Sequence, residues 1–298
     1  MNPDYEVIGE TMLAVRDLHK SYGNREVLRG VSFTVSKGQI VSLLGSNGSG
    51  KTTTFRCLLN LTDYREGSIR YNGAKTDGRK MGYLPEERSL FFDVEIYRQL
   101  KYVDMLKGMS REDADREITY WMDRLKVSQY RHEIPLMLSK GNQQKIQLIM
   151  CLLGNPEIII MDEPWTGLDR DNAGIFQSVL LELKRKNRMI LLSSHQYQPI
   201  QEYCDRFLYL KNGEIVINKT RGQFQAMPER IVEVEHDADF FFHDELIRKT
   251  VTKDRKVSFL MSSDEDAWRI MEKIKGMKAV TSIKKRCLNI NDVIGELK

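Results

Sequence analysis

Apolar and polar positions follow two different periods along the chain. The first part alternates short β-rich runs with turns, which predicts strands at "LAVRDL", "VLRGVSFTV" and "QIVSLLGS" between residues 12 and 44. A glycine-rich loop comes next, and a predicted helix begins in "KTTTFRCLLNL". Two more strands are predicted at "GSIRYNG" and "KMGYL". This part of the chain is therefore predicted to be mainly β-structure around one helix.

The pattern becomes helical between residues 94 and about 127. Ser110 and Asp113 form a predicted N-cap pair for the stretch "SREDADREITYWMDRLKV". Its apolar positions share one helical face, and they are Ile118, Trp121, Met122 and Leu125. An amphipathic helix that packs within a helical subdomain, at about residues 90–153, is the expected structure.

A second α/β section follows this helical region. "LSKGNQQKIQLIMCLLG" predicts a helix that Gly154 and Pro156 close, and "EIIIM" is an uninterrupted apolar run. Such a run is typical of a central parallel strand covered on both faces. "RMILLSS", a helix and "RFLYLKNGEIV" then complete the alternation. We therefore expect an α/β fold with a mainly parallel sheet.

The composition of the chain changes after Pro228. Short strand patterns and two helical stretches predict a small α+β appendage of ferredoxin-like type, with Ser262 and Glu265 as a capping box for its longer helix. The three phenylalanines of "DFFFHDE" are read as core packing, or alternatively as a regulatory or dimerisation surface. The expected domains are residues 1–222 and 223–298.

Composition and charge narrow the class of protein. The 298 residues are 41% hydrophobic and 30% charged, with a net charge of +4, which suits a globular protein with a buried core. No apolar run reaches the roughly 18 residues of a membrane span. No basic block indicates a nucleic-acid arm, so no nucleic-acid partner is expected. The four cysteines are far apart and form no CxxC pair, which favours reduced thiols and a cytosolic compartment.

One segment carries a complete phosphate-binding pattern. Gly45, Ser46, Asn47, Gly48, Ser49, Gly50, Lys51 and Thr52 match G-x-x-x-x-G-K-[ST], with an apolar strand before it and a helix, entered at Thr53, after it. The glycines allow backbone N–H groups to surround phosphates, and the helix N-terminus adds positive charge. Lys51 is expected to neutralise the β- and γ-phosphates, and the Thr52 hydroxyl to bind Mg²⁺.

Three polar residues follow buried strands farther along the chain. Asp162 and Glu163 end the strand "EIIIM", where Asp162 is expected to hold Mg²⁺ through water and Glu163 to act as general base toward an attacking water. His195 closes the next strand. A histidine at a strand end is often purely structural, but here it is expected to contact the γ-phosphate and the attacking water.

These residues, with the helix between them, resemble the ATPase subunit of ABC transporters. The resemblance covers about residues 12–220 and rests on six motifs in order. They are Walker A at Gly45–Thr52, a Q-loop region at Gly82–Glu86, the signature at Leu138–Gln144, Walker B at Ile158–Glu163, a D-loop at Thr166–Asp169 and the switch histidine His195. The resemblance implies a P-loop ATPase domain with a parallel sheet core, an antiparallel β part and a helical subdomain, and it implies ATP and Mg²⁺ as ligands.

The resemblance also implies a second ATPase subunit, as a second copy or as a paralogue. In the family, each ATP lies between Walker A of one subunit and the signature helix of the other. Ser139, Gly141 and the first residues of that helix, Asn142 and Gln143, would thus contact the partner's ATP, and Asp169 would lie at the same interface. Tyr22 matches the aromatic residue that stacks on adenine, against the simpler reading of an exposed turn tyrosine.

Two motifs depart from the usual family pattern, at three residues. The signature has Lys140 and Asn142 where LSGGQ has glycine and glutamine, and Glu86 replaces the Q-loop glutamine as a possible Mg²⁺ ligand. Both changes resemble bacterial subunits that pair with separate membrane proteins exporting sodium, drugs, antibiotics or peptides. The resemblance then implies a polytopic permease bound near residues 86–105 and a peripheral location on the cytoplasmic face of the membrane.

Two other classes of ATPase agree less well with the sequence. A soluble ABC ATPase acting on ribosomes or DNA usually carries two cassettes or an inserted coiled coil, and this chain has one uninterrupted cassette. A catalytically weak regulatory subunit is disfavoured because Lys51, Asp162, Glu163 and His195 are all present. The expected function is therefore ATP hydrolysis coupled to a permease, with drugs, lipids or amphipathic peptides as the expected cargo.

Overall fold

The computed structural model describes residues 12–195, 200, 202–237 and 240–297, and the chain falls into two units, residues 1–218 and 219–298. The first unit begins with a three-stranded antiparallel sheet in the order β2-β1-β4. Its strands are β1 (Met12–Tyr22), β2 (Arg25–Ser36) and β4 (Glu66–Tyr71). The apolar side chains of this sheet pack on the second sheet of the unit and on helix α1 (Lys51–Leu58), in one continuous core.

The second sheet of this unit has six strands in the order β5-β6-β7-β3-β8-β9. They are β5 (Met81–Leu84), β6 (Ile158–Met161), β7 (Met189–Ser194), β3 (Ile40–Leu44), β8 (Arg206–Lys211) and β9 (Glu214–Thr220). The pairings from β5 to β8 are parallel. Every residue of β3, β6 and β7 is buried, which confirms the prediction of central strands covered on both faces.

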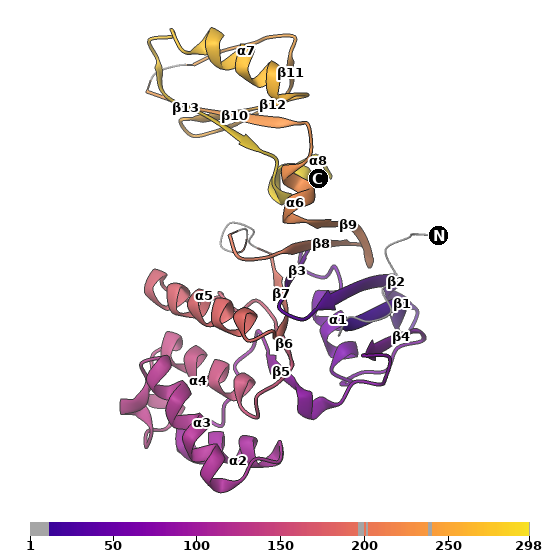
Figure 1. The fold of residues 1–298 in the computed structure, drawn as a ribbon, viewed down its shortest axis with the longest axis vertical. Coiled ribbons are helices and arrows are strands. Elements are labelled where there is room, and N and C mark those ends of the chain that lie inside the picture. Colours follow the sequence, from indigo (N-terminus) through magenta and orange to yellow (C-terminus); the bar gives the residue numbers. More distant parts are fainter. Residues whose placement is uncertain (1–11, 196–199, 201, 238–239, 298) are drawn as a thin grey trace. The chain divides into compact units, whose positions relative to one another are not determined.

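Helices α4 (Lys140–Leu152) and α5 (Arg170–Arg185) lie on the side of the parallel sheet away from the antiparallel sheet (Figure 1). Helices α2 (Ile96–Leu106) and α3 (Arg111–Arg124) pack against each other and against α4. Short 3₁₀ turns are found at Gly78–Lys80, Ser128–Tyr130 and Pro135–Met137. The Ser110 hydroxyl accepts a hydrogen bond from the Asp113 N–H at 3.1 Å, so the predicted cap of α3 is confirmed. The predicted apolar face is also buried, and it comprises Ile118, Trp121 and Met122 of α3 and Leu125 directly after the helix.

The register of the parallel strands determines where the functional loops lie. Leu44 of β3 pairs with Ser194 of β7, and Met161 of β6 pairs with Leu192 of β7. The carboxyl ends of β3, β6 and β7 therefore lie side by side at one edge of the sheet, which is where ligands bind in open parallel sheets.

Among the described residues, no helix is both long and apolar enough to cross a membrane.

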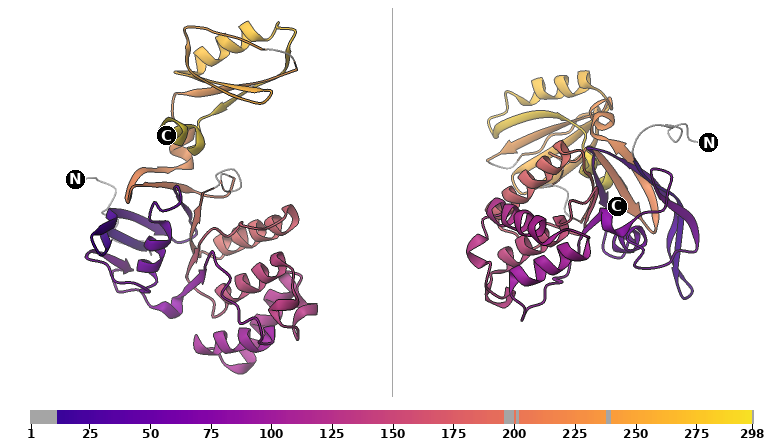
Figure 2. Two further views of the ribbon diagram at one scale, coloured as in Figure 1. Left: turned by 180° about the vertical axis from the view of Figure 1, so that it is seen from behind. Right: turned by 60° about the horizontal axis from the view of Figure 1, so that its bottom comes forward.

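The second unit is an α+β domain with a four-stranded antiparallel sheet in the order β11-β12-β10-β13. After the short helix α6 (Arg221–Gln225) come β10 (Arg230–His236), β11 (Ile247–Lys253), β12 (Lys256–Met261), α7 (Asp264–Ile274), β13 (Val280–Cys287) and α8 (Ile290–Leu297). This is the strand order of a ferredoxin-like sheet, with an irregular segment where the first crossover helix would be. Helix α7 lies along one face of the sheet (Figure 2).

Two details of this unit differ from or refine the sequence-based expectation. The capping box at Ser262 and Glu265 is wrong by one residue, because Ser263 caps α7 and accepts a hydrogen bond from the Asp266 N–H at 3.1 Å. Met261 is fully buried as the last residue of β12, so the chain cannot turn into the helix earlier. Of the three phenylalanines, Phe240 and Phe242 pack into the core under α7, whereas Phe241 is exposed.

Candidate active site

The loop between β3 and α1 has the backbone conformation of a phosphate cradle. Gly48 and Gly50 have φ values of 77° and 111°, which other residues rarely adopt, and Gly50 is the N-cap of α1. A Cβ atom on Gly45 would lie 2.5 Å from the carbonyl oxygen of Leu210 in the neighbouring strand β8. The glycines are thus required by the turn itself and by its close packing against the sheet.

Lys51 is buried at the start of α1 with its side chain turned back over the loop. Its Nζ donates hydrogen bonds to the carbonyl oxygens of Gly45 at 2.9 Å and of Ser46 at 3.2 Å. Nζ also lies 3.7 Å from Oε1 of Glu163. An ammonium group held in the mouth of the loop is placed to neutralise an anion that enters it.

Asp162 is held from two sides at the end of β6. The Thr52 hydroxyl donates to its Oδ2 at 2.7 Å, and the Ser193 hydroxyl donates to its Oδ1 at 2.5 Å. The side chain is almost fully buried. Both partners are hydroxyl donors, so they fix the orientation of the carboxylate next to the phosphate loop.

Glu163 has the most constrained position in the site. Its φ is +48°, a strained value for a residue with a side chain, and its N–H donates to the Ser193 hydroxyl at 2.9 Å. Its Oε2 accepts from the backbone N–H of His195 at 3.2 Å and lies 2.9 Å from Nδ1 of the same residue. Oε1 has no hydrogen-bond donor among the described residues. One carboxylate oxygen is therefore held in place while the other is free to accept a proton.

A cavity of about 380 Å³ opens in front of these groups. Its floor comprises the phosphate loop and the two carboxylates, through Asn47, Gly48, Gly50, Lys51, Thr52, Thr53, Asp162 and Glu163. Gly45, Ser46 and Ser49 belong to the loop but do not line the cavity, and His195 adjoins it only through its contact with Glu163. A volume of this size is within the range of small-molecule and cofactor sites.

Tyr22, Arg25 and Val27, from the end of β1 and the start of β2, also line the cavity. Tyr22 is 47% exposed, and the Lys20 ammonium lies 4.7 Å from the centroid of its ring. A half-exposed aromatic face that lines a phosphate cavity is suited to stacking on a heterocyclic base. The structure thus places Tyr22 and the phosphate loop on one cavity.

Glu86 lines the cavity next to the two buried carboxylates. Desolvation and repulsion by Asp162 and Glu163 raise the pKa of Glu86 above its usual value. The backbone around it is held by α4, since the Gln147 amide donates to the carbonyl oxygens of Pro85 at 3.1 Å and of Glu87 at 3.0 Å. Glu86 therefore adds negative charge to the site and is tied to the signature helix.

The signature residues do not line this cavity. Ser139 is the exposed N-cap of α4 and accepts a hydrogen bond from the Asn142 N–H at 3.3 Å. The Asn142 amide donates to the Tyr130 hydroxyl at 3.2 Å. The Gln143 side chain is buried and donates to the carbonyl oxygens of Pro135 and Leu138, so it supports its own loop.

Gly141 and Asp169 are brought together through Asn172. Asp169 is the N-cap of α5, and its carboxylate accepts hydrogen bonds from the backbone and the side-chain amide of Asn172 at 2.8 and 3.0 Å. The same amide nitrogen lies 2.7 Å from the position that a Cβ on Gly141 would occupy. The starts of α4 and α5 therefore form one surface in which the signature glycine has no room for a side chain.

Three residues of the site were not predicted from the sequence. Arg25 lines the cavity, the Ser193 hydroxyl links the Asp162 carboxylate to the backbone N–H of Glu163, and Gln147 holds the backbone on both sides of Glu86. Ser193 could have been found from the sequence, because it lies near the end of the apolar strand "RMILLSS", which follows the Asp162 strand in the predicted sheet. Arg25 and Gln147 had no comparable signal, because a polar residue in a turn or a helix usually faces solvent.

Known proteins resemble this chain over most of its length. Residues 28–166 match the sequence pattern of the family described as ABC transporter. An ABC transporter ATP-binding protein of Methanocaldococcus jannaschii is 38% identical over 254 residues, covering 85% of this chain and 92% of the relative. For YhaQ and NatA of Bacillus subtilis, also ABC transporter ATP-binding proteins, identity is 32% and 30%. The YhaQ match covers 96% of this chain and 98% of YhaQ, and the NatA match covers 80% and 99%.

Solved structures share the fold of the first unit. A structure described as the ATP-binding subunit of an ABC transporter has a TM-score of 0.68 and 31% identity, covering 72% of this chain and 92% of the other. A dimeric bacterial ABC transporter cassette has a TM-score of 0.65 at 23% identity, covering 70% and 98%, which supports the fold alone. Both structures have the P-loop ATPase architecture predicted from the motifs.

Proposed function

The chain belongs to the ABC transporter family of ATP-binding proteins, and from that premise we propose that it is the ATP-hydrolysing subunit that drives a separate membrane permease. ATP hydrolysis is the activity of this family. The observation that carries the proposal is the convergence of Lys51, Thr52, Asp162 and Glu163 on one cavity, with His195 bonded to Glu163.

The bound ATP has a place for each of its parts. Its phosphates enter the loop of Gly48 and Gly50, where the N–H groups at the start of α1 and the Lys51 ammonium meet them. Its adenine stacks on Tyr22, which lines the same cavity. When ATP binds, contacts with its phosphates replace the hydrogen bonds from Lys51 to the carbonyl oxygens of Gly45 and Ser46. The ammonium group therefore already lies where the negative charge of the phosphates will be.

The donor set between Thr52 and Asp162 fits Mg²⁺. The described residues contain no group of three or more histidine, cysteine, aspartate or glutamate side chains arranged to hold a metal ion. A hydroxyl and a carboxylate joined at 2.7 Å, with Glu86 nearby, are the few oxygen ligands that Mg²⁺ takes when the nucleotide's phosphates supply the others. The ion would neutralise charge on the β- and γ-phosphates.

Hydrolysis requires a base for the attacking water. Glu163 is proposed for this role, because Oε2 is held by His195 while Oε1 faces Lys51 and accepts no hydrogen bond from the described residues. His195 keeps the carboxylate oriented and reaches the γ-phosphate. A base held in this way loses no further orientational freedom when it takes a proton from the water that attacks the γ-phosphate, which is the advantage of a preorganised site.

A second ATPase subunit completes the site. Ser139, Gly141 and Asn142 start a helix that does not face the cavity of its own chain, so its anion-binding end is available to ATP held by another subunit. Lys140, exposed beside them, adds a positive charge. Asp169 lies beside Gly141 through Asn172 and belongs to the same interface. ATP then links two subunits, and hydrolysis releases them.

The permease is proposed to dock near residues 86–105. Phe91 is 57% exposed and Tyr102 is 59% exposed, close in sequence to Glu86. Exposed aromatic side chains at a loop and a helix are suited to receive a short helix of a membrane partner. The chain would then lie on the cytoplasmic face of the membrane as a peripheral subunit. Export of drugs, lipids or amphipathic peptides is proposed from the Lys140 and Glu86 substitutions.

Affinity purification from the membranes of its own cell in mild detergent, followed by mass spectrometry, tests this function. The expected result is a polytopic membrane protein in stoichiometric amount. The same purification with Phe91→Asp and Tyr102→Asp should lose that protein, whereas the control Tyr120→Asp, an exposed tyrosine outside the segment, should retain it. Recovery with ribosomes, or without any membrane protein, would overturn the transporter assignment and favour a soluble ATPase.

A further inference from the structure

The second unit contains a groove that the ATPase cycle does not use. It lies between α7 and β13 and has a volume of about 400 Å³. Trp268, Met271, Glu272 and the C-cap Lys275 line it from the helix side, and residues 280–283 line it from the strand. Trp268 is 53% exposed, which is unusual for so large an apolar side chain in a domain of this size.

The strand side of the groove is an open sheet edge. β13 pairs with β10 and with no other described strand. The His236 N–H donates to the Arg255 carbonyl, so even-numbered residues of β10 bond toward β12 and odd-numbered residues bond toward β13. The partners of these odd-numbered residues are Ser282 and Lys284. The N–H and C=O groups of Ile283 and Lys285 therefore point outward and are available to another strand.

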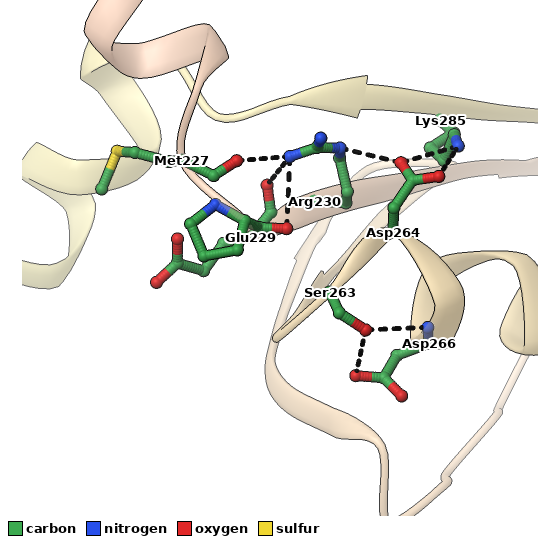
Figure 3. A network of polar contacts seen from close by, with 8 residues as sticks. Met227, Glu229, Arg230, Ser263, Asp264, Asp266 and Lys285 are labelled. Carbon is green, nitrogen blue, oxygen red and sulfur yellow. Dashed lines mark hydrogen bonds and ion pairs between the residues drawn. The ribbon is translucent and has the colours of Figure 1, made fainter.

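The helix side of the groove is fixed relative to this edge. Figure 3 shows the Asp264 carboxylate bonded to Lys285 of β13, at 2.7 and 2.8 Å, and to Arg230 of β10, at 2.9 Å. Arg230 also donates to the carbonyl oxygens of Met227 and Glu229. The Lys285 ammonium lies 4.4 Å from the centroid of the Trp268 ring. The start of α7 is thus anchored, and the groove is formed before any partner arrives.

The charge of the edge selects its occupant. β13 carries Lys284, Lys285 and Arg286 in succession and has no acidic residue. Lys285 and Arg286 have carboxylate partners, but Lys284 and the groove-lining Lys275 have none among the described residues. A second copy pairing β13 with β13 in antiparallel fashion would bring like charges together, which is destabilising. Glu272 also lines the groove and balances Lys275, so the excess positive charge lies along β13 itself. An acidic strand paired with β13 would meet that charge and the unpaired Lys284.

We propose that the groove between α7 and β13 binds an extended acidic segment of a partner protein, which adds as a fifth strand to β13 and places one apolar side chain in the cavity against Trp268. Strand addition supplies main-chain hydrogen bonds for affinity, and the pocket beside it selects the side chain. The proposal assigns a role to the second unit and does not depend on the proposed function of the first.

The test uses the full chain and a displayed library of random peptides about ten residues long, which span a strand of ordinary length. Enriched peptides are expected to alternate apolar and acidic residues. Trp268→Ala should weaken their binding about tenfold, as for an aromatic hot spot, and Lys284→Glu should weaken it severalfold. The matched controls are Phe241→Ala, an exposed aromatic residue of the same unit, and Lys253→Glu on the opposite edge strand β11. Both should leave binding unchanged.

Amide hydrogen exchange separates strand addition from simple binding in a pocket. Bound peptide should slow exchange at Ile283 and Lys285, whose N–H groups point outward, and should change it little at Ser282 and Lys284, which are already bonded to β10. The absence of any enriched peptide, equal binding by Trp268→Ala and the control, or no added protection at Ile283 would each overturn the proposal. If the Ile283 N–H becomes protected from exchange without peptide as the protein concentration rises, the proposal is overturned, because β13 would then pair with β13 of a second copy.

Discussion

Oε2 of Glu163 lies 2.9 Å from Nδ1 of His195, and the backbone N–H of His195 donates to the same oxygen at 3.2 Å. The two residues are 32 positions apart and end adjacent strands of the parallel sheet. Ser193, two residues before the histidine, also accepts a hydrogen bond from the Glu163 N–H. The end of β7 therefore fixes both the backbone and the side chain of the proposed general base.

Glu163→Gln tests the base directly. Glutamine has nearly the same shape but cannot take a proton, so turnover should fall about a hundredfold or more while ATP binding is retained. The mutant should also accumulate as an ATP-bound dimer, because release depends on hydrolysis. Phosphate release in the steady state and size-exclusion chromatography with ATP measure the two effects. Glu214→Gln, at an exposed position of β9, is the control, and unchanged turnover in Glu163→Gln would contradict the assignment.

Lys51→Ala should lose affinity for ATP. The lysine supplies charge-assisted hydrogen bonds, each worth about 1.5–3 kcal/mol, so a decrease in affinity of roughly tenfold to a hundredfold is expected by calorimetry. The exposed Lys37→Ala is the matched control. Because Lys51 also bonds to the carbonyl oxygens of Gly45 and Ser46, thermal unfolding without nucleotide must show that the variant is folded. Normal ATP binding by a folded Lys51→Ala protein would count against the phosphate cradle.

Glu86→Gln should bind ATP more tightly than the original chain. Glu86 is the third carboxylate at the cavity, and removing one charge a few ångströms from the phosphates is expected to raise affinity roughly threefold to tenfold. Desolvation, and then repulsion by the neighbouring carboxylates, raise the pKa of Glu86, so in the original chain affinity should also rise as the pH falls and Glu86 becomes protonated. This part of the pH dependence should be absent in Glu86→Gln and present in the control Glu87→Gln. Equal affinities at every pH would refute the repulsion.

Asp104 is expected to destabilise the helical subdomain at neutral pH. It is fully buried on α2, neither carboxylate oxygen has a hydrogen-bond donor among the described residues, and burial and the charge of Glu117 raise its pKa to about 6. The folded state therefore binds a proton more tightly than the unfolded state, and stability falls as the pH rises from about 4 to about 6. Asp104→Asn should raise the free energy of unfolding at pH 7 by about 1–3 kcal/mol.

Denaturant unfolding at pH 4 and pH 7 checks this sign, since the stabilisation by Asp104→Asn should be smaller at pH 4. Asp115→Asn is the control with the opposite expectation. Hydrogen bonds from Tyr97 and Lys101 lower the pKa of Asp115, so its contribution to stability is present above the unfolded pKa and is lost as the pH falls. A destabilised Asp104→Asn protein at pH 7 would show that the buried carboxylate is favourable in its ionised form.

Local features of the fold could be predicted because neighbouring residues determine them. Ser110 caps α3 through the N–H of Asp113, three residues later. The apolar run of β6 is too short for a helix and is therefore recognised as a buried strand. The cap of α7 was displaced by one residue, because Ser262 and Ser263 are equally able to cap and the end of β12 decides between them. The contacts of Gln147 with Pro85 and Glu87 span about sixty residues, and no local pattern indicates them.

The sequence by itself determined the phosphate loop. Its strand, its glycines and its helix are contiguous, so the backbone conformation of Gly48 and Gly50 follows from short-range sterics. Only the tertiary structure decided which groups face that loop. Asp162 contacts Thr52 of the loop, and His195 contacts Glu163 beside it, because β3, β6 and β7 are parallel neighbours whose carboxyl ends share one edge. Lys284 lies on an open edge because β13 is the last strand of its sheet. Strand order is set by packing over the whole domain, which no short segment encodes.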